Sequence, residues 1–181
     1  MSHLNVYRDE TGKTAPESYE EQESIARALA QAGVRFERWE AKVPLTADST
    51  PAEILEAYSG AVERLMKERG FQSNDVINVT SKLPNVGELR TKFLTEHTHA
   101  EDEARFVVDG SGLFCIHHTS GIYAVLCTRG DLINVPAGIP HWFDFGDEPN
   151  FKCIRFFGNP DGWIAQFTGS DISKLFPKHP S

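Results

Sequence analysis

The sequence predicts a mainly β protein, an antiparallel barrel or sandwich preceded by helices. Within the first 70 residues, two segments carry apolar residues at helical spacing. From residue 75 onward the apolar residues form short runs, and glycine, proline and small polar residues separate most of them. Many short strands at close, even spacing are typical of antiparallel barrels and sandwiches.

The length of 181 residues favours a single domain. We expect a helical N-terminal extension over residues 1–74, packed on a barrel core formed by residues 75–157, with a short helix and tail over 158–181. Hydrophobic residues make up 40% of the chain and charged residues 24%, which is ordinary for a globular protein.

Two helices are expected in the N-terminal part. The first covers residues 16–32, where apolar residues recur at helical spacing before Gly33. The second begins after Thr50, whose hydroxyl can form a capping box with Glu53, and it ends at Gly70. A strand begins between the two helices, at residues 34–36.

The predicted barrel strands share a run of apolar residues bounded by turn residues. They cover residues 76–79, 105–108, 113–117, 122–127, 132–135, 141–145 and 151–157. A last short helix is expected over residues 160–167, and the tail after it is expected to be loose.

Charge and composition exclude several classes of partner. The formal net charge of −8 disfavours nucleic acid and anionic membranes. No apolar run approaches the length of a membrane span, and the first residues do not resemble a secretory signal. Three cysteines, Cys115, Cys127 and Cys153, lie in apolar runs. We interpret them as reduced, buried thiols of a cytoplasmic protein.

Two imidazoles and a carboxylate lie within seven residues, at His97, His99 and Glu103, and His141 follows a stiff turn further along. Alternate residues of a strand share a face, so His97 and His99 can converge on one point. Three histidines and a carboxylate suit iron, nickel, manganese or copper, and leave two of six octahedral positions open. No cysteine lies beside these ligands, which disfavours a structural zinc site.

The other histidines are weaker candidates. A lone HxH can also be two exposed histidines on a strand edge. His117 and His118 are adjacent, so only one of them can face a given side of a strand; we interpret both as surface residues or as neighbours of the ligands. His3 and His179 lie near the ends of the sequence and are expected to be exposed.

Two arginines are candidates for holding an anionic substrate. Arg105 has the same strand parity as Glu103, and a guanidinium beside a metal binds anionic oxygens well. The alternative is a surface ion pair of Arg105 with Glu101 or Asp102. Arg155 is the weaker candidate, because a buried arginine needs a charged partner.

Aromatic residues are candidates for the cavity wall. Phe93 shares strand parity with the first two histidines, and Phe143 shares it with His141. Together with Trp163, they could surround an apolar group of the substrate. Plain core packing is the alternative for all three.

The spacing of the ligands resembles the two motifs of the cupin family. HxHxxxE is followed by six residues and Gly110; later come Gly130, five residues, Pro136-x-Gly138, two residues and His141. The resemblance implies a jelly-roll β-barrel with the metal inside. Thr91 departs from the usual glycine of the first motif and Phe145 from the usual asparagine of the second, but neither position is a ligand.

A closer resemblance covers most of the chain. The runs KFLTEHTHAEDEARFVVDGSGLFCIH, GDLINVPAGIPHWFD and RFFGNPDGW are similar to the acireductone dioxygenase family of methionine salvage. This implies that His97, His99, Glu103 and His141 bind one Fe²⁺ or Ni²⁺ per chain, with Arg105 offsetting the charge of the substrate.

The same resemblance implies a reaction of O₂ with 1,2-dihydroxy-3-keto-5-methylthiopentene. The iron form gives 4-methylthio-2-oxobutanoate and formate, and the nickel form gives methylthiopropionate, formate and carbon monoxide. The ligand set does not decide between the two metals.

Two rival functions remain open at this stage. Another cupin enzyme, such as a sugar isomerase or a different dioxygenase, would share the ligands but have a more polar cavity. A non-enzymatic cupin that senses a ligand would usually carry a second functional module. We expect a monomer, since no heptad run or obvious edge-pairing strand is visible.

Overall fold

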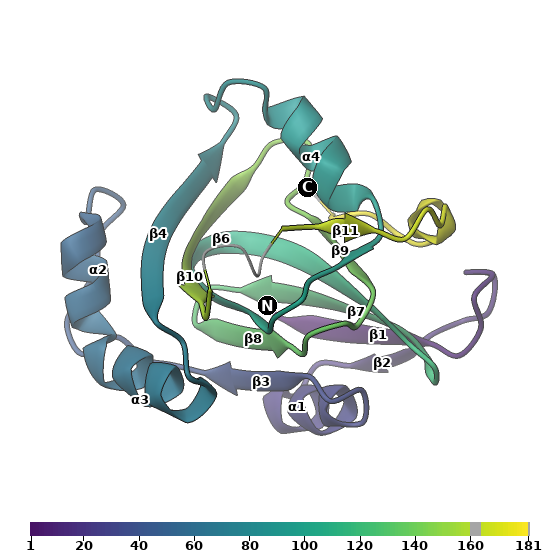
Figure 1. Cartoon of the computed structure of the whole chain (residues 1–181), viewed down its shortest axis with the longest axis horizontal. Coiled ribbons are helices and arrows are strands. Elements are labelled where there is room, and N and C mark those ends of the chain that lie inside the picture. The colour runs from purple at the N-terminus through teal and green to yellow at the C-terminus, as the bar shows by residue number, and fades with distance from the viewer. Residues whose placement is uncertain (160–163, 181) are drawn as a thin grey trace.

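The computed structural model describes residues 1–159 and 164–180. Its strands form two antiparallel sheets that share one long strand, β6 (Glu103–His118). The first sheet has the order β2-β1-β7-β6-β9-β5-β11, and the second has the order β4-β10-β6-β8-β3. The sheets curve around the centre of the molecule (Figure 1). The predicted mainly β, antiparallel class is confirmed.

The remaining strands are short, as their spacing in the sequence predicted. They are β1 (His3–Tyr7), β2 (Glu17–Tyr19), β3 (Arg35–Arg38), β4 (Ser73–Thr80), β5 (His97–Thr98), β7 (Gly121–Thr128), β8 (Asp131–Val135), β9 (His141–Asp144), β10 (Asn150–Phe157) and β11 (Gln166–Phe167).

The shared strand β6 changes partners halfway along. Residues 103–110 pair with β8 and β10, whereas residues 111–118 pair with β7 and β9. Gly110 lies at the junction with a φ of 75°, and a Cβ there would be 1.6 Å from the carbonyl oxygen of Asn150. The close approach of β10 therefore requires glycine at this position.

An extra residue in β6 changes which side chains face inward. The register against β10 shifts at Val108, which has no partner of its own. Before this bulge the odd-numbered Glu103 and Arg105 face inward; after it the even-numbered Phe114 does. The bulge therefore directs side chains from both halves of one strand into a single cavity.

The first 74 residues contribute strands as well as helices. β1 pairs with β7, and β3 pairs with β8, so this part of the chain is joined to both sheets by hydrogen bonds. The helix expected over residues 16–32 is shorter than predicted: α1 spans Gln22–Ala30, and residues 17–19 form β2 instead. β2 gains its backbone partners from β1, which the helical pattern could not reveal.

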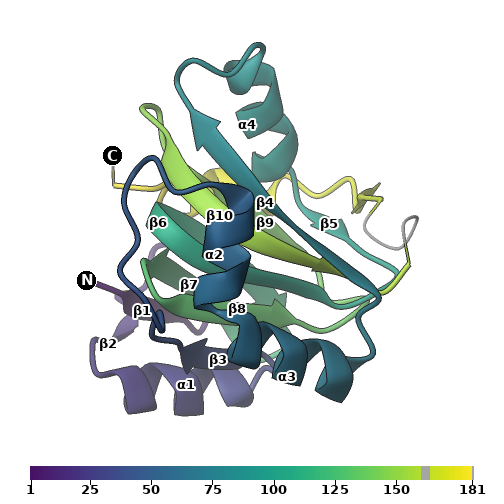
Figure 2. The same ribbon diagram turned by 90° about the vertical axis from the view of Figure 1, so that its left-hand side faces the viewer.

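The second predicted helix is divided in two. α2 (Pro51–Ala57) starts with the expected Thr50–Glu53 capping box, and α3 (Ser59–Arg69) ends at Gly70, whose φ is 74°. Tyr58 separates them, with a non-helical backbone. Both helices pack on the outer face of the second sheet (Figure 2), where Trp39 stacks on Phe106 of β6 with ring centroids 4.7 Å apart.

Residues between β4 and β5 form a helix that the sequence analysis did not predict. α4 spans Val86–Leu94 and carries Phe93, which had been assigned to a strand. Arg90 of this helix forms an ion pair with the buried Asp144 of β9: its Nε donates to Oδ1 at 2.7 Å and its Nη2 to Oδ2 at 3.1 Å. No helix of the described residues is long and apolar enough to cross a membrane.

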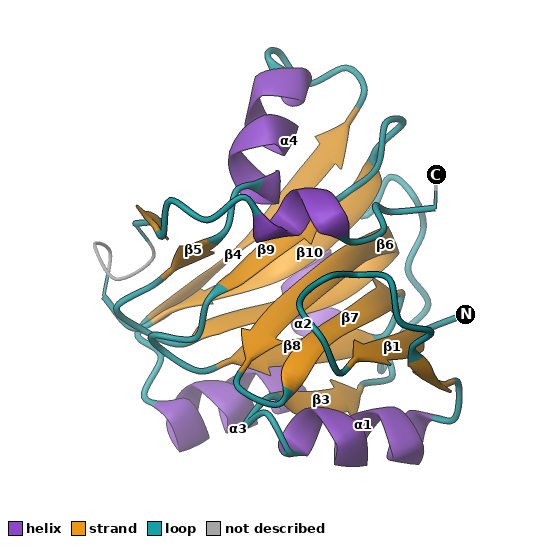
Figure 3. Cartoon of the chain, turned by 90° about the vertical axis from the view of Figure 1, so that its right-hand side faces the viewer, coloured by secondary structure: helices purple, strands orange, loops and turns teal. Residues whose placement is uncertain are grey.

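The C-terminal part differs from the prediction. Gln166 and Phe167 form β11 against β5, so the helix expected over residues 160–167 is wrong at its described end. The tail is packed and not loose. A 3₁₀ helix spans Ile172–Leu175, and the ring of Phe176 packs on that of Tyr7 with centroids 5.1 Å apart. Figure 3 shows the C-terminal tail close to β6. Nε2 of His179 forms a hydrogen bond with the hydroxyl of Ser111 in that strand. The tail was misjudged because its apolar contacts are all distant in sequence.

The three cysteines are buried and unpaired, as predicted. Each belongs to a strand, and burial raises the pKa of Cys153 to about 12. Such thiols stay protonated at neutral pH and act as small apolar side chains.

Candidate metal centre

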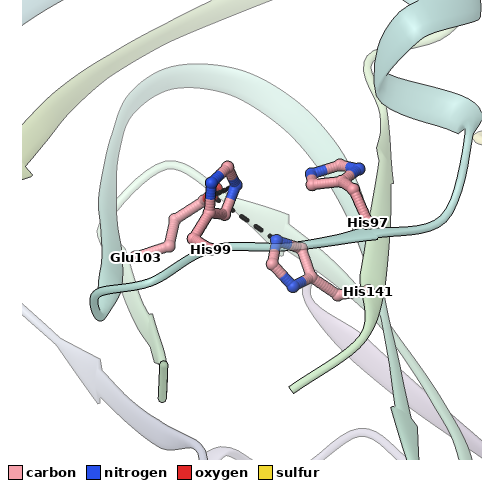
Figure 4. Close-up of side chains that lie close together, drawn as sticks. All are labelled: His97, His99, Glu103 and His141. Atoms are coloured by element: carbon pink, nitrogen blue, oxygen red, sulfur yellow. Dashed lines mark ion pairs between the residues drawn. The ribbon is translucent and has the colours of Figure 1, made fainter. Parts of the chain in front are cut away.

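Three strands bring the four predicted ligands together. His97 lies on β5, His99 follows it directly, Glu103 begins β6 and His141 begins β9. His97 and His141 are opposite each other in the β5–β9 pair. The candidate ligand atoms all lie within 4.8 Å of one another, and the side chains point toward a common centre (Figure 4).

The ligand side chains are buried and in close contact. Nε2 of His99 lies 2.8 Å from Oε2 of Glu103, and Nε2 of His141 lies 3.4 Å from the same oxygen. The histidines are between 2% and 7% exposed. The surrounding protein therefore largely excludes water from these side chains.

Backbone carbonyls orient two of the imidazoles. Nδ1–H of His97 donates to the carbonyl oxygen of Thr95 at 2.7 Å, and Nδ1–H of His141 donates to that of Ile139 at 2.8 Å. A hydrogen bond from Nδ1–H leaves Nε2 as the basic nitrogen. Both histidines are therefore held in the tautomer that presents Nε2 to the centre.

Two further observations fit a divalent metal ion. Nδ1 of His99 and Nε2 of His141 are buried and have no hydrogen-bond partner within the described part of the chain. Buried polar atoms of proteins are normally paired. A metal ion at the centre would supply the missing partner of the His141 nitrogen.

The electrostatics of His97 and Glu103 favour the forms that bind metals, whereas burial would lower the pKa of His141 but the neighbouring Glu103 carboxylate raises it. Burial, together with the neighbouring His141, lowers the pKa of His97 to about 4. Burial alone would raise the pKa of Glu103, but the charge of Arg105 and the neighbouring imidazoles of His141 and His99 hold it well below its usual value. A neutral imidazole and an ionised carboxylate are the ligand forms that a divalent ion requires. The four residues make a site that fits such an ion.

A pocket of about 350 Å³ lies beside the ligands. Most of its wall is apolar, and Arg105 lies beside the ligand Glu103. The lining residues are Ile77, Val79, Lys92, Phe93, His97, His99, Glu103, Arg105, Phe114, Phe143, Phe151, Arg155, Ile164, Ala165 and Phe167. A small anion with an apolar tail suits such a cavity better than a polyhydroxylated sugar does.

The sequence model of the ARD/ARD′ family matches residues 3–165. The chain belongs to the ARD/ARD′ family. It is 50% identical over 177 residues to the acireductone dioxygenase of Pseudomonas paraeruginosa, with 98% of each chain covered. It is 51% identical over 181 residues to that of an Enterobacter species, covering 99% of this chain and all of the relative.

A solved ARD structure has the same fold. The acireductone dioxygenase of Bacillus anthracis, described as having a cadmium ion in its active centre, superposes with a TM-score of 0.81 at 31% identity. The match covers 92% of this chain and 98% of that one. The likeness therefore extends over nearly the whole chain.

The two arginines of this ARD-family chain both line the pocket. Nη2 of Arg105 lies 3.4 Å from Oε1 of Glu103, and the side chain is 13% exposed, so the alternative of a surface ion pair is not what the structure has. Arg155 forms a two-pronged ion pair with Asp75, at 2.8 and 2.6 Å. That carboxylate is the charged partner that a partly buried arginine needs.

The aromatic candidates have different outcomes. Phe143 lines the pocket from β9, as its strand parity predicted. Phe93 also lines the pocket, but from α4, so its placement was predicted correctly for the wrong reason. It packs edge-on against Phe143 with ring centroids 5.9 Å apart. Trp163 lies outside the described residues.

Sequence reasoning missed part of the pocket wall. Lys92 was overlooked because Phe93 was expected to lie on a strand, where neighbouring side chains point to opposite faces. Both residues lie on α4 instead, and both line the pocket. Phe167 was assigned to a helix, whereas β11 places it beside His97 with ring centroids 6.1 Å apart. The apolar spacing of Val86, Leu89 and Phe93 was the available signal for α4.

The remaining histidines lie outside the ligand cluster. Nδ1 of His117 is 2.7 Å from the buried carboxylate of Glu96, which precedes the first ligand. His118 is bonded to Ser120. His179 was expected to be exposed, but it is partly buried against Ser111.

Proposed function

We propose that this chain catalyses the reaction of O₂ with an acireductone, 1,2-dihydroxy-3-keto-5-methylthiopentene, in methionine salvage. The observation that carries the proposal is a site of three histidines and one glutamate beside a mostly apolar pocket. Its relatives of the same length and about half-identical sequence are acireductone dioxygenases.

The shape and charge of the pocket suit this substrate. An acireductone ionises to an ene-diolate next to a ketone, and its other end is a methylthioethyl tail. Arg105 and Arg155 place positive charge beside the ligand end, where the anionic oxygens would bind. Phe93 and Phe143 provide apolar surface for the tail.

The metal we propose is one Fe²⁺ or Ni²⁺ held by His97, His99, Glu103 and His141. When bound, such an ion supplies Lewis acidity and open coordination positions at which the substrate oxygens can bind. We expect 4-methylthio-2-oxobutanoate and formate from the iron form. From the nickel form we expect methylthiopropionate, formate and carbon monoxide.

The chain's own residues bind, orient and shield the substrate. Arg105 would neutralise the ene-diolate, which keeps the electron-rich anion in a water-poor site. The phenylalanine wall excludes water from the reacting carbons. The hydrogen bonds to Thr95 and Ile139 keep His97 and His141 oriented while the substrate enters and leaves.

We also propose a cytoplasmic monomer. Three reduced, buried cysteines support a reducing compartment. Gel filtration combined with light scattering tests the monomer, which should elute with the 20.2 kDa mass of one chain.

The function is tested by oxygen consumption and product analysis on protein loaded separately with Fe²⁺ and with Ni²⁺. We expect rapid oxygen uptake with the acireductone, no uptake after the metal is removed, and carbon monoxide from the nickel form alone. A polyhydroxylated sugar should be neither isomerised nor oxidised. A metal-loaded protein that consumes no oxygen with the acireductone would contradict the proposal and favour another cupin function.

A further inference from the structure

Two separate segments have to be held at a fixed spacing for the four ligands to converge. Residues 97–103 supply three ligands, and residues 136–140 form the turn that delivers His141. The two segments touch through the hydrogen bond from Gly138 N–H to the carbonyl oxygen of His99, at 2.9 Å. The side chain of Asp102 adds a second connection between the two segments.

Asp102 joins the ligand segment to its surroundings through both carboxylate oxygens. Oδ1 accepts the backbone N–H of Ala137, in the turn before His141, at 3.1 Å. Oδ2 accepts from Arg69 at 2.5 Å and from the amide of Asn134 at 3.2 Å. Three elements therefore meet at one carboxylate: the end of α3, strand β8 and the turn.

The donors around Asp102 call for an anion with two acceptor oxygens. Asn134 is fully buried, and its other amide atom, Oδ1, has no partner in the described part of the chain. Arg69, the last residue of α3, brings a positive charge. A neutral side chain at position 102 would leave at least one of these donors without an acceptor.

We propose that Asp102 is a positioning residue that sets the metal affinity of the site. It fixes the distance between the segment that carries His99 and Glu103 and the turn that carries His141. The inference rests on the proposed metal site, and it assigns no contact of Asp102 with metal or substrate. Partners that hold ligands in place, without touching the metal, are known to govern affinity.

Glu101 offers a matched control in the same loop. It is one residue away and also carries a carboxylate, but this carboxylate accepts the backbone N–H of Asn159, after β10, at 2.7 Å. It has no bond to the turn before His141 among the described residues. Replacing Glu101 therefore perturbs the loop and removes a charge without touching the connection between the two ligand segments.

The test measures Ni²⁺ affinity by competition with a chelator for Asp102→Ala, Asp102→Asn, Glu101→Ala and Glu101→Gln. We expect Asp102→Ala to bind Ni²⁺ about 10- to 100-fold more weakly than the unchanged chain. Asp102→Asn keeps the size and one acceptor oxygen, so its loss should be smaller but above that of Glu101→Gln. Both Glu101 variants should stay within about twofold of the unchanged chain.

Two further readouts separate positioning from general loss of structure. The metal-free Asp102 and Glu101 variants should all remain folded at the temperature of the affinity measurement, and the absorption spectrum of the Co²⁺-loaded protein should change for Asp102 variants only. Unchanged affinity in Asp102→Asn, or equal weakening by the Glu101 variants, would overturn the inference. If the unchanged chain itself bound no divalent ion, the proposed metal site would be wrong, which is a separate and distinguishable result.

Discussion

At the scale of single residues, the chemistry of the site depends on charges placed in a dry environment. Glu103 is 10% exposed and still ionised, because Arg105 and the histidines stabilise its charge. The spacing of the ligands allowed all four to be predicted from the sequence, since strand parity and a proline-rich turn restrict where each can point. The contact of Asp102 with Ala137 could not be predicted, because it joins residues 35 positions apart.

The first prediction concerns Arg105. Replacing it with alanine should leave one metal per chain but lower kcat/KM for the acireductone by about 10- to 100-fold, or ~1.4–2.8 kcal/mol of transition-state stabilisation. The loss follows from removing the positive charge nearest the ligands. Steady-state kinetics with metal analysis measure both effects.

Arg64→Ala is the control for that measurement, because Arg64 pairs with Glu37 away from the pocket. It should leave kcat/KM unchanged. An Arg105→Ala protein with full catalytic efficiency would show that the guanidinium has no part in holding the substrate.

At the scale of elements, α4 shows where local patterns failed. The residue before the helix, Asn85, has a left-handed backbone, and its side chain makes no capping hydrogen bond. The helix is held instead by distant contacts: Phe93 on the core and Arg90 on Asp144. By contrast, the second N-terminal helix carried a complete capping box, and its start was predicted to the residue.

The second prediction concerns the Arg90–Asp144 pair. Asp144 is 1% exposed, so Arg90→Gln would leave a buried carboxylate without its cation. We expect a loss of about 2–4 kcal/mol in the free energy of unfolding at pH 7, by urea denaturation. Arg8→Gln, which breaks an exposed pair with Glu17, should cost less than about 1 kcal/mol.

The effect of Arg90→Gln should depend on pH. Burial would raise the pKa of Asp144, but hydrogen bonds from Arg90 and from the backbone of His179 and Gly146 lower it below its usual value. The stability from this carboxylate is thus present above the unfolded pKa of about 4 and is lost as the pH falls through the folded value. The variant and the unchanged chain should converge in stability below that pH. A difference that persists undiminished in acid would contradict this account.

At the scale of the whole molecule, strand β6 belongs to both sheets, and residues of both sheets line one pocket. The short apolar runs separated by turn residues predicted the class of fold, but the sharing of β6 between the two sheets depends on long-range contacts. The chain ends also depend on contacts that are distant in sequence: β1 pairs with β7, and Phe176 packs on Tyr7. Local sequence carries little information about such pairings, which explains why the tail was predicted to be loose.

The third prediction concerns Gly110, where β6 changes sheets. Alanine would place its Cβ 1.6 Å from the Asn150 carbonyl oxygen at a φ of 75°, so β10 would have to move. We expect a loss of more than about 2 kcal/mol in stability, seen as a lower thermal midpoint. Gly87→Ala on α4 meets nothing within 4 Å and should be neutral or stabilising by about 0.5–1 kcal/mol. Equal midpoints for the two variants would refute the role given to Gly110.

The central claim is that four side chains from three strands share one divalent ion. Anomalous diffraction from crystals grown with Ni²⁺, recorded at the nickel edge, tests it most directly. We expect one peak per chain, about 2.0–2.2 Å from a nitrogen of His97, His99 and His141 and from a carboxylate oxygen of Glu103. A peak elsewhere, or no peak while these side chains remain clustered, would contradict the claim.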